Sequence, residues 1–201
     1  MLTTKDCHYK AVVMGVSFGG LNALKTIIPQ LPADFPVPIM VVQHHDRYAD
    51  DFLAGFLDNQ SALRVKVAEE KEMAMAGSVY LAPANYHLLV EDDTTLSLSL
   101  DEKVNYVRPA VDVLFESAAD VYGARLIGII LTGANNDGSK GLECIKESGG
   151  LSIVQDPATA EAPNMPEAAI AITTVDHIVP LDAVAPLLVS LFQQKLSPKN
   201  C

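Results

Sequence analysis

Cysteine, histidine and tryptophan are scarce in this chain, which has 201 residues, three cysteines, five histidines and no tryptophan. Cys7, Cys144 and Cys201 are odd in number and have neither CxxC nor zinc-ligand spacing, which indicates reduced thiols rather than a disulfide framework. The histidines form no H-x-x-x-H pair and no cluster with cysteine, so we expect no metal site.

Positive charge is also scarce, with 14 Lys and Arg against 25 Asp and Glu and a net charge of −11. The absence of a basic stripe excludes nucleic acid as a partner, because phosphate contacts need clustered basic residues. No apolar run reaches the roughly 18–20 residues of a membrane span, and the N-terminus lacks the apolar region of a secretion signal. We therefore expect a cytoplasmic protein with no direct membrane insertion.

Apolar residues make up 49% of the chain and charged residues 19%, which is typical of a globular protein. The length fits one domain over residues 1–201, and no repeat or linker divides the chain. The oligomeric state leaves no mark in the sequence.

Short unbroken apolar runs alternate with helical patterns, which is typical of buried strands in a parallel sheet. We expect strands near 11–14, 39–42, 64–67, 78–82, 126–131 and 151–155, and helices near 21–31, 52–57, 109–123, 139–148 and 184–192. Residues 96–100 alternate strictly after a turn at 92–94, so 87–100 is predicted to be a hairpin. Residues 157–166 contain three prolines and are predicted to be irregular. The predicted fold is α/β, with a mainly parallel central sheet flanked by helices and an antiparallel hairpin at one margin.

Three of the predicted strands are followed directly by chemically reactive side chains. Ser17 lies in Gly15-Val16-Ser17-Phe18-Gly19, His44 follows the second run, and Asp137 lies in the segment after residues 126–131. The carboxyl ends of parallel strands face one crevice, so these side chains are expected to meet there. Serine, histidine and aspartate are the components of a serine hydrolase.

Each of these residues also has an ordinary structural interpretation. The G-x-S-x-G pattern occurs in many glycine-rich turns, and such a turn can also hold a phosphate at a helix N-terminus. His44 and His45 fit simple polar positions at a strand end, and Asp137 fits an N-cap or a turn. The catalytic hypothesis depends on all of them following core strands together. Strand alternation lets only one of the adjacent histidines face the crevice.

Several motifs in order resemble the catalytic domain of CheB, the chemotaxis protein-glutamate methylesterase. They are Gly15–Gly20, Gln43-His44, Arg108–Phe115, Leu131–Gly138, Leu81-Ala82-Pro83 with His87, and Gln155–Ala160 with Met165-Pro166. The similarity extends from about residue 10 to about residue 190. It selects His44 as the histidine of the triad.

The resemblance implies a parallel α/β fold and a triad of Ser17, His44 and Asp137. It implies an oxyanion site formed by the backbone N–H of Ala134, with that of Phe18 as a second donor. It also implies removal of methyl groups from glutamyl esters of chemoreceptor proteins and, in some members, deamidation of glutamine. The motifs require no cofactor.

The sequence departs from the family pattern at three points. Phe18 stands where many members have threonine, and Ala134 where they commonly have methionine. Only about nine residues precede the first predicted strand, whereas typical members carry a phosphorylated N-terminal receiver domain. We therefore expect a stand-alone catalytic domain without that switch.

Arg108 and Met165 lie in motif segments near the expected cleft, where each is a candidate for substrate binding. A helix-flanking charge and a packed core residue are the respective alternatives. Two other functions stay open at this point. One is an esterase or amidase acting on another protein or a small ester, and the other is a non-catalytic module that docks to receptors.

Overall fold

The structure is a computed structural model that describes residues 9–44 and 52–193. These residues form a seven-stranded sheet in the order β3-β4-β2-β1-β7-β8-β9, and every neighbouring pair is parallel. The strands are β1 (Ala11–Val16), β2 (Ile39–Gln43), β3 (Arg64–Val67), β4 (Ser78–Leu81), β7 (Leu126–Ile130), β8 (Leu151–Gln155) and β9 (His177–Val179). The predicted parallel α/β architecture is confirmed.

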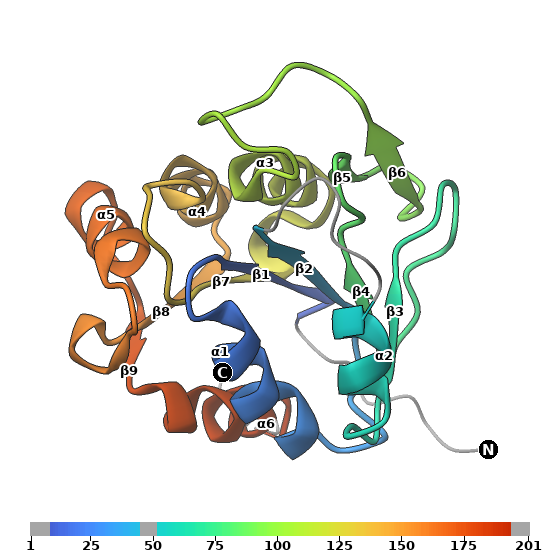
Figure 1. The fold of residues 1–201 in the computed structure, drawn as a ribbon, viewed down its shortest axis with the longest axis horizontal. Helices are drawn as coiled ribbons and strands as arrows, with labels where there is room; N and C mark the ends of the chain where they lie inside the picture. Colours follow the sequence, from blue (N-terminus) through green and yellow to red (C-terminus); the bar gives the residue numbers. More distant parts are fainter. Residues whose placement is uncertain (1–8, 45–51, 194–201) are drawn as a thin grey trace, which may run out of the picture.

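Helices cover both faces of this sheet (Figure 1). One face carries α1 (Gly20–Ile27), α2 (Phe52–Asp58) and α6 (Val184–Gln193), and the other carries α3 (Val111–Tyr122), α4 (Ser139–Glu147) and α5 (Asn164–Ile172). Alternate residues of β1 therefore enter two different cores. Val12, Met14 and Val16 face the α1 side, and Ala11 and Val13 face the α3 side. Burial on both faces explains why the central strands are continuous apolar runs.

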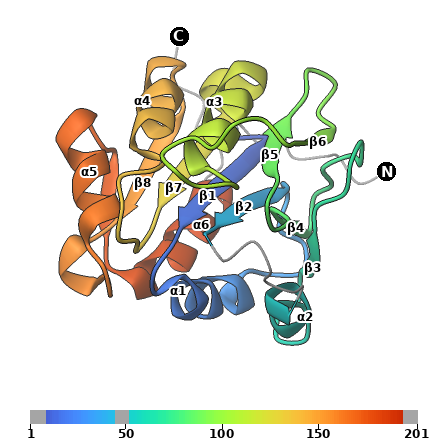
Figure 2. The same ribbon diagram turned by 45° about the horizontal axis from the view of Figure 1, so that its top comes forward.

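The predicted hairpin consists of β5 (His87–Val90) and β6 (Leu96–Ser99), which pair antiparallel. It forms a separate two-stranded sheet rather than an edge of the main one. Leu88, Val90 and Leu96 are buried in the core that includes α3, so the hairpin packs beside that helix (Figure 2).

Helix α5 and strand β9 were not among the expected elements, and residues 157–166 differ from the irregular segment that was expected. Residues 157–166 are not wholly irregular, because a short 3-10 helix spans Pro157–Thr159 and α5 begins at Asn164. Pro166 lies in the first turn of α5, where a missing N–H costs no helical hydrogen bond. Strand β9 was not predicted, because its three residues are too few to show an apolar pattern.

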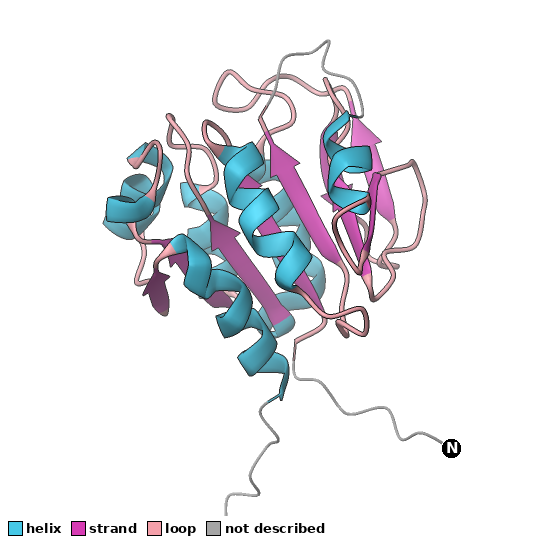
Figure 3. Cartoon of the chain, turned by 60° about the horizontal axis from the view of Figure 1, so that its bottom comes forward, coloured by secondary structure: helices cyan, strands magenta, loops and turns pink. Residues whose placement is uncertain are grey.

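Strand β1 lies between β2 and β7 at the centre of the sheet. Figure 3 shows the helices of one face lying across the strands. The chain passes from β1 to β2 on one side, and β7 joins on the other, so the strand order reverses at this point. Ligand sites of open α/β sheets lie at such a reversal. None of the described helices combines the length and apolar character that crossing a membrane requires.

Candidate active site

Ser17 lies in the tight turn between β1 and α1. Its N–H donates to the carbonyl of Thr132 at 2.9 Å, and its own carbonyl accepts from the N–H of Gly20 at 2.9 Å. Gly19 has a φ of +81°, a left-handed conformation that glycine adopts without strain. A Cβ at Gly19 would also lie 2.8 Å from the Cβ of Glu161. The Gly-rich turn is therefore needed to present Ser17 at the sheet edge.

The loop after β7 packs directly against Ser17. A Cβ built on Gly133 would lie 2.9 Å from the Cβ of Ser17, so a larger residue there would displace the serine. The hydroxyl of Thr132 donates to the carbonyl of Phe18 at 2.9 Å and joins the two loops. Within the described residues, the backbone N–H groups of Phe18 and Ala134 donate to no acceptor. Their role as oxyanion donors stays a prediction.

His44 follows β2 and forms a hydrogen-bonded pair with Asp137. Its backbone N–H donates to the carbonyl of Val16 at 3.0 Å, which sets His44 beside the end of β1. Its ring Nε2 lies 2.7 Å from Oδ2 of Asp137, and its Nδ1 lies 3.3 Å from Nδ2 of Asn135. These partners assign the proton to Nε2 and the lone pair to Nδ1. Nδ1 is therefore the nitrogen that can accept a proton.

Asp137 is completely buried and accepts hydrogen bonds from several directions. Besides His44, its donors are the N–H groups of Val111 at 2.6 Å and Asp112 at 3.2 Å, and Nδ2 of Asn105 at 2.8 Å. Val111 and Asp112 begin α3, so the carboxylate lies at the positive end of that helix. Burial alone raises the pKa of Asp137, but the hydrogen bonds from His44, Val111 and Asn105 outweigh it and hold the pKa below its usual value. Asp137 therefore stays ionised beside His44.

A second buried carboxyl group, that of Asp112, lies next to Asp137. The amide nitrogen of Asn105 donates to both carboxylates at 2.8 Å and thus bridges them. Burial raises the pKa of Asp112 despite a hydrogen bond from the N–H of Gly141, and the charge of Asp137 raises it further. The sequence reasoning missed Asn105 and gave Asp112 no role. Asp112 lies inside the recognised 108–115 motif, whereas Asn105 lies outside every motif.

Gln43 connects the backbones of the serine and the histidine. Its single Nε2 donates to the carbonyl of Ser17 at 2.9 Å and to that of His44 at 2.8 Å. A Cβ on Gly20 would overlap Oε1 of Gln43, so glycine there makes room for this side chain. Gln43 was part of the recognised Gln-His motif, but the sequence gave no reason for it.

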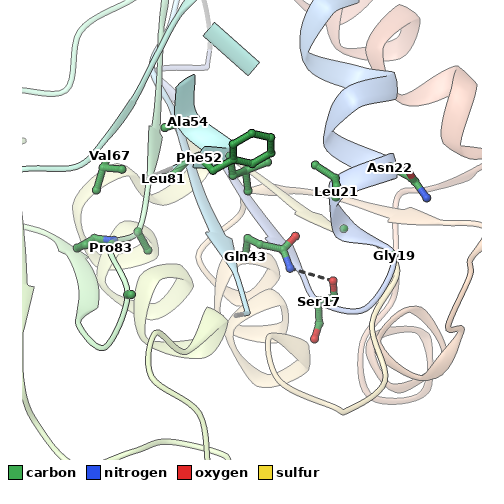
Figure 4. Close-up of a pocket in the computed structure, with 14 residues that line it drawn as sticks. Ser17, Gly19, Leu21, Asn22, Gln43, Phe52, Ala54, Val67, Leu81 and Pro83 are labelled. Atoms are coloured by element: carbon green, nitrogen blue, oxygen red, sulfur yellow. Dashed lines mark hydrogen bonds between the residues drawn. The ribbon is translucent and has the colours of Figure 1, made fainter. Parts of the chain in front are cut away.

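Ser17 also lines a pocket of about 390 Å³ on the α1 and α2 side of the sheet (Figure 4). The pocket lies between the start of α1, the start of α2 and the ends of β2, β3 and β4. His44 is not among its described lining residues. The hydrogen bond of His44 leads to Asp137 at the start of α3, whereas the pocket extends toward α1 and α2.

The structure places the two substrate-binding candidates in well-packed surroundings. The guanidinium of Arg108 donates to the carbonyls of Leu100 and Asp101 and to Oδ1 of Asn85. Met165 is only 1% exposed, and its Sδ packs directly against Gly133. Substrate contact by either residue stays a prediction.

His45 lies outside the described residues. Among the described residues, no group of His, Cys, Asp or Glu is suited to hold a metal ion.

Comparison with known proteins shows which family the chain belongs to. The sequence profile described as CheB methylesterase matches residues 12–188. A Leptospira interrogans protein, provisionally named protein-glutamate methylesterase/protein-glutamine glutaminase, is 50% identical over 96% of this chain and 100% of its own length. A Carboxydothermus hydrogenoformans enzyme with the same activities in its name is 44% identical over 87% of this chain and 53% of its own length.

A solved structure supports the same assignment. The crystal structure of the Thermotoga maritima CheB methylesterase catalytic domain matches with a TM-score of 0.88 and 39% identity, over 91% of this chain and 98% of that one. The family profile covers most of the chain, and the relatives and the solved fold agree with it. The chain therefore belongs to the CheB methylesterase family of carboxylic-ester hydrolases.

Proposed function

We propose that this protein is a serine hydrolase that removes methyl esters from glutamyl side chains of chemoreceptor proteins in the cytoplasm. In this proposal residues 1–201 act as one catalytic domain, with Ser17 as nucleophile, His44 as base and Asp137 as the group that orients His44. The observation that carries the proposal is the 2.7 Å pair between His44 and Asp137, formed beside the Ser17 turn. The names of the relatives supply the substrate class.

The first step is formation of an acyl-enzyme. The Oγ of Ser17 attacks the ester carbonyl while Nδ1 of His44 accepts the serine proton. The serine hydroxyl takes the place of the Asn135 amide, whose present 3.3 Å approach to Nδ1 is long for a hydrogen bond. The N–H groups of Phe18 and Ala134 stabilise the oxyanion, and one such donor is worth roughly 10²–10³ in rate.

Collapse of the tetrahedral intermediate breaks the bond between carbon and methoxide. His44 returns its proton to the departing oxygen, so methanol leaves and Ser17 remains acylated. A water molecule then attacks the acyl group, again with His44 as base, and releases glutamate and free serine. The ionised Asp137 stabilises the imidazolium that forms in each step. A glutamine side chain would follow the same route with ammonia as the leaving group.

The test is methanol release from a methyl-esterified chemoreceptor fragment. We expect Ser17→Ala and His44→Ala each to lose at least about a thousandfold in rate, as in other enzymes with this type of triad. His45→Ala is the matched control and should retain most of the activity. Near-normal release by Ser17→Ala would contradict the nucleophile. Turnover of an activated ester without methanol release from the receptor fragment would contradict the substrate.

A further inference from the structure

The pocket beside Ser17 is too large for the methyl group of the proposed reaction. Its volume is about 390 Å³. A methyl group is close in size to a water molecule, whose share of liquid volume is about 30 Å³. The leaving methoxide would therefore occupy only a small part of this space.

The walls of the pocket favour an uncharged, aliphatic occupant. Most of them are apolar, among them Leu21, Val67, Leu81 and Ala84. The polar side chains are those of Ser17, Asn22 and Gln43, and no charged side chain is among the described lining residues. Leu21 is 45% exposed, so apolar surface remains open to solvent at this site. Covering such surface with an apolar group is favourable.

The position of His44 decides which part of an ester points into the pocket. The leaving oxygen must lie next to His44 to receive its proton. The ring of His44 is held on the α3 side, by Asn135 and by Asp137 at the start of that helix. The pocket extends from Ser17 toward α1 and α2 instead. The acyl side of the ester, opposite the leaving group, therefore faces the pocket.

We propose that this pocket is a binding site for an aliphatic group on the acyl side of the scissile ester. The proposal rests on the proposed function, in which Ser17 is the nucleophile. In a small ester the aliphatic group is the acyl chain itself. In a protein substrate it is an aliphatic side chain next to the esterified glutamate.

The first experiment measures kcat/KM for 4-nitrophenyl acetate, butyrate and hexanoate. Burial of one methylene is worth about fourfold, so butyrate should react about fifteenfold faster than acetate. Ala84→Phe fills the half-buried loop side of the pocket and should bring the butyrate-to-acetate ratio toward one. Leu21→Ser, at an exposed position of α1, should lower the ratio without disturbing the core. Ala171→Phe, exposed on α5, is the matched control and should keep the wild-type ratio.

The second experiment compares glutamyl methyl ester peptides in which both neighbours of the ester are leucine or both are serine. If the leucine peptide releases methanol faster and the ester series also favours longer acyl chains, the pocket binds an aliphatic side chain of a protein substrate. If only the ester series favours longer acyl chains, the pocket binds the acyl chain of a small ester.

Ser17-dependent hydrolysis with equal rates for all three esters would overturn the pocket proposal and leave the proposed function standing. An unchanged butyrate-to-acetate ratio in folded Ala84→Phe and Leu21→Ser would overturn it as well. Turnover that persists in Ser17→Ala would instead contradict the proposed function itself.

Discussion

Gln43 is the residue that joins the two halves of the proposed acyl-transfer machinery. Its amide nitrogen donates to the carbonyls of both Ser17 and His44, so one side chain sets the spacing between their backbones. Reacting groups must be held within a fraction of an ångström, and a 1 Å displacement can cost about a hundredfold in rate. Gln43 is thus a positioning residue, because no bond of its side chain reaches the side chain of Ser17 or His44.

We predict that Gln43→Met lowers kcat about ten- to hundredfold, with little change in KM. Methionine has a similar length but no N–H donor, so the two carbonyls lose their common partner. Steady-state kinetics on 4-nitrophenyl acetate measures the effect, because its short acyl chain leaves most of the pocket that Gln43 also lines unfilled. Gln30→Met, at an exposed position of the 3-10 helix after α1, is the control. An unchanged kcat, or a loss confined to KM, would refute the positioning role.

The members of the candidate triad could be selected from the sequence because each lies in a segment that follows an apolar strand. Ser17 and His44 come immediately after β1 and β2, and Asp137 comes a few residues after β7. The hydrogen bonds that surround Asp137 could not be predicted in this way. Asn105 is 32 residues from Asp137 in the sequence, and its bridge to Asp112 forms only when the loop before α3 folds back. Local patterns report burial and turns, whereas such bonds depend on tertiary packing.

Among the secondary-structure elements, long apolar strands and helices with clear periodicity were predicted well. Strand β9 and helix α5 were missed. Strand β9 is too short to show a pattern, and α5 begins inside a segment whose three prolines indicated an irregular loop. Strand β9 pairs with β8, and Asp176 in the turn that precedes β9 adds a second link to the sheet. This carboxylate accepts from Nζ of Lys146 at 2.7 and 2.8 Å, and from the N–H and hydroxyl of Ser152 at 2.8 and 2.9 Å. Asp176 thereby connects α4 and β8 to the β9 turn.

We predict that Asp176→Asn lowers the free energy of unfolding by about 1 kcal/mol at pH 7, since part of the group is exposed. Burial alone raises the pKa of Asp176, but hydrogen bonds from Lys146 and Ser152 outweigh it and lower the pKa. A lowered pKa stabilises the fold above the unfolded value near 4, and that contribution disappears as the pH falls through the folded pKa.

Urea denaturation at pH 7 and at successively lower pH values measures this difference. The gap between wild type and Asp176→Asn should shrink below about pH 4. Asp92→Asn, in the exposed turn between β5 and β6, controls for the loss of one surface charge. A gap that stays constant or widens at low pH would show that Asp176 does not act as an ionised anchor.

At the scale of the whole molecule, the two faces of the sheet supply different parts of the proposed site, and both parts lie near Ser17. The α3 face supplies the start of the helix that binds Asp137, and the α1 and α2 face supplies the apolar pocket. The strand order reverses at β1, so Ser17 lies where both sides are accessible. We propose that the fold itself makes one serine, Ser17, strongly nucleophilic.

The most direct measurement of that claim is covalent labelling with a fluorophosphonate, which reacts with activated serines. The 201-residue chain, without any phosphodonor, is incubated with the reagent and its intact mass is followed over time. We predict a single adduct on Ser17, and slow or no labelling in His44→Ala, because the serine depends on its base. An adduct on a different residue, or equally fast labelling of His44→Ala, would contradict the proposal that the fold activates Ser17 through His44.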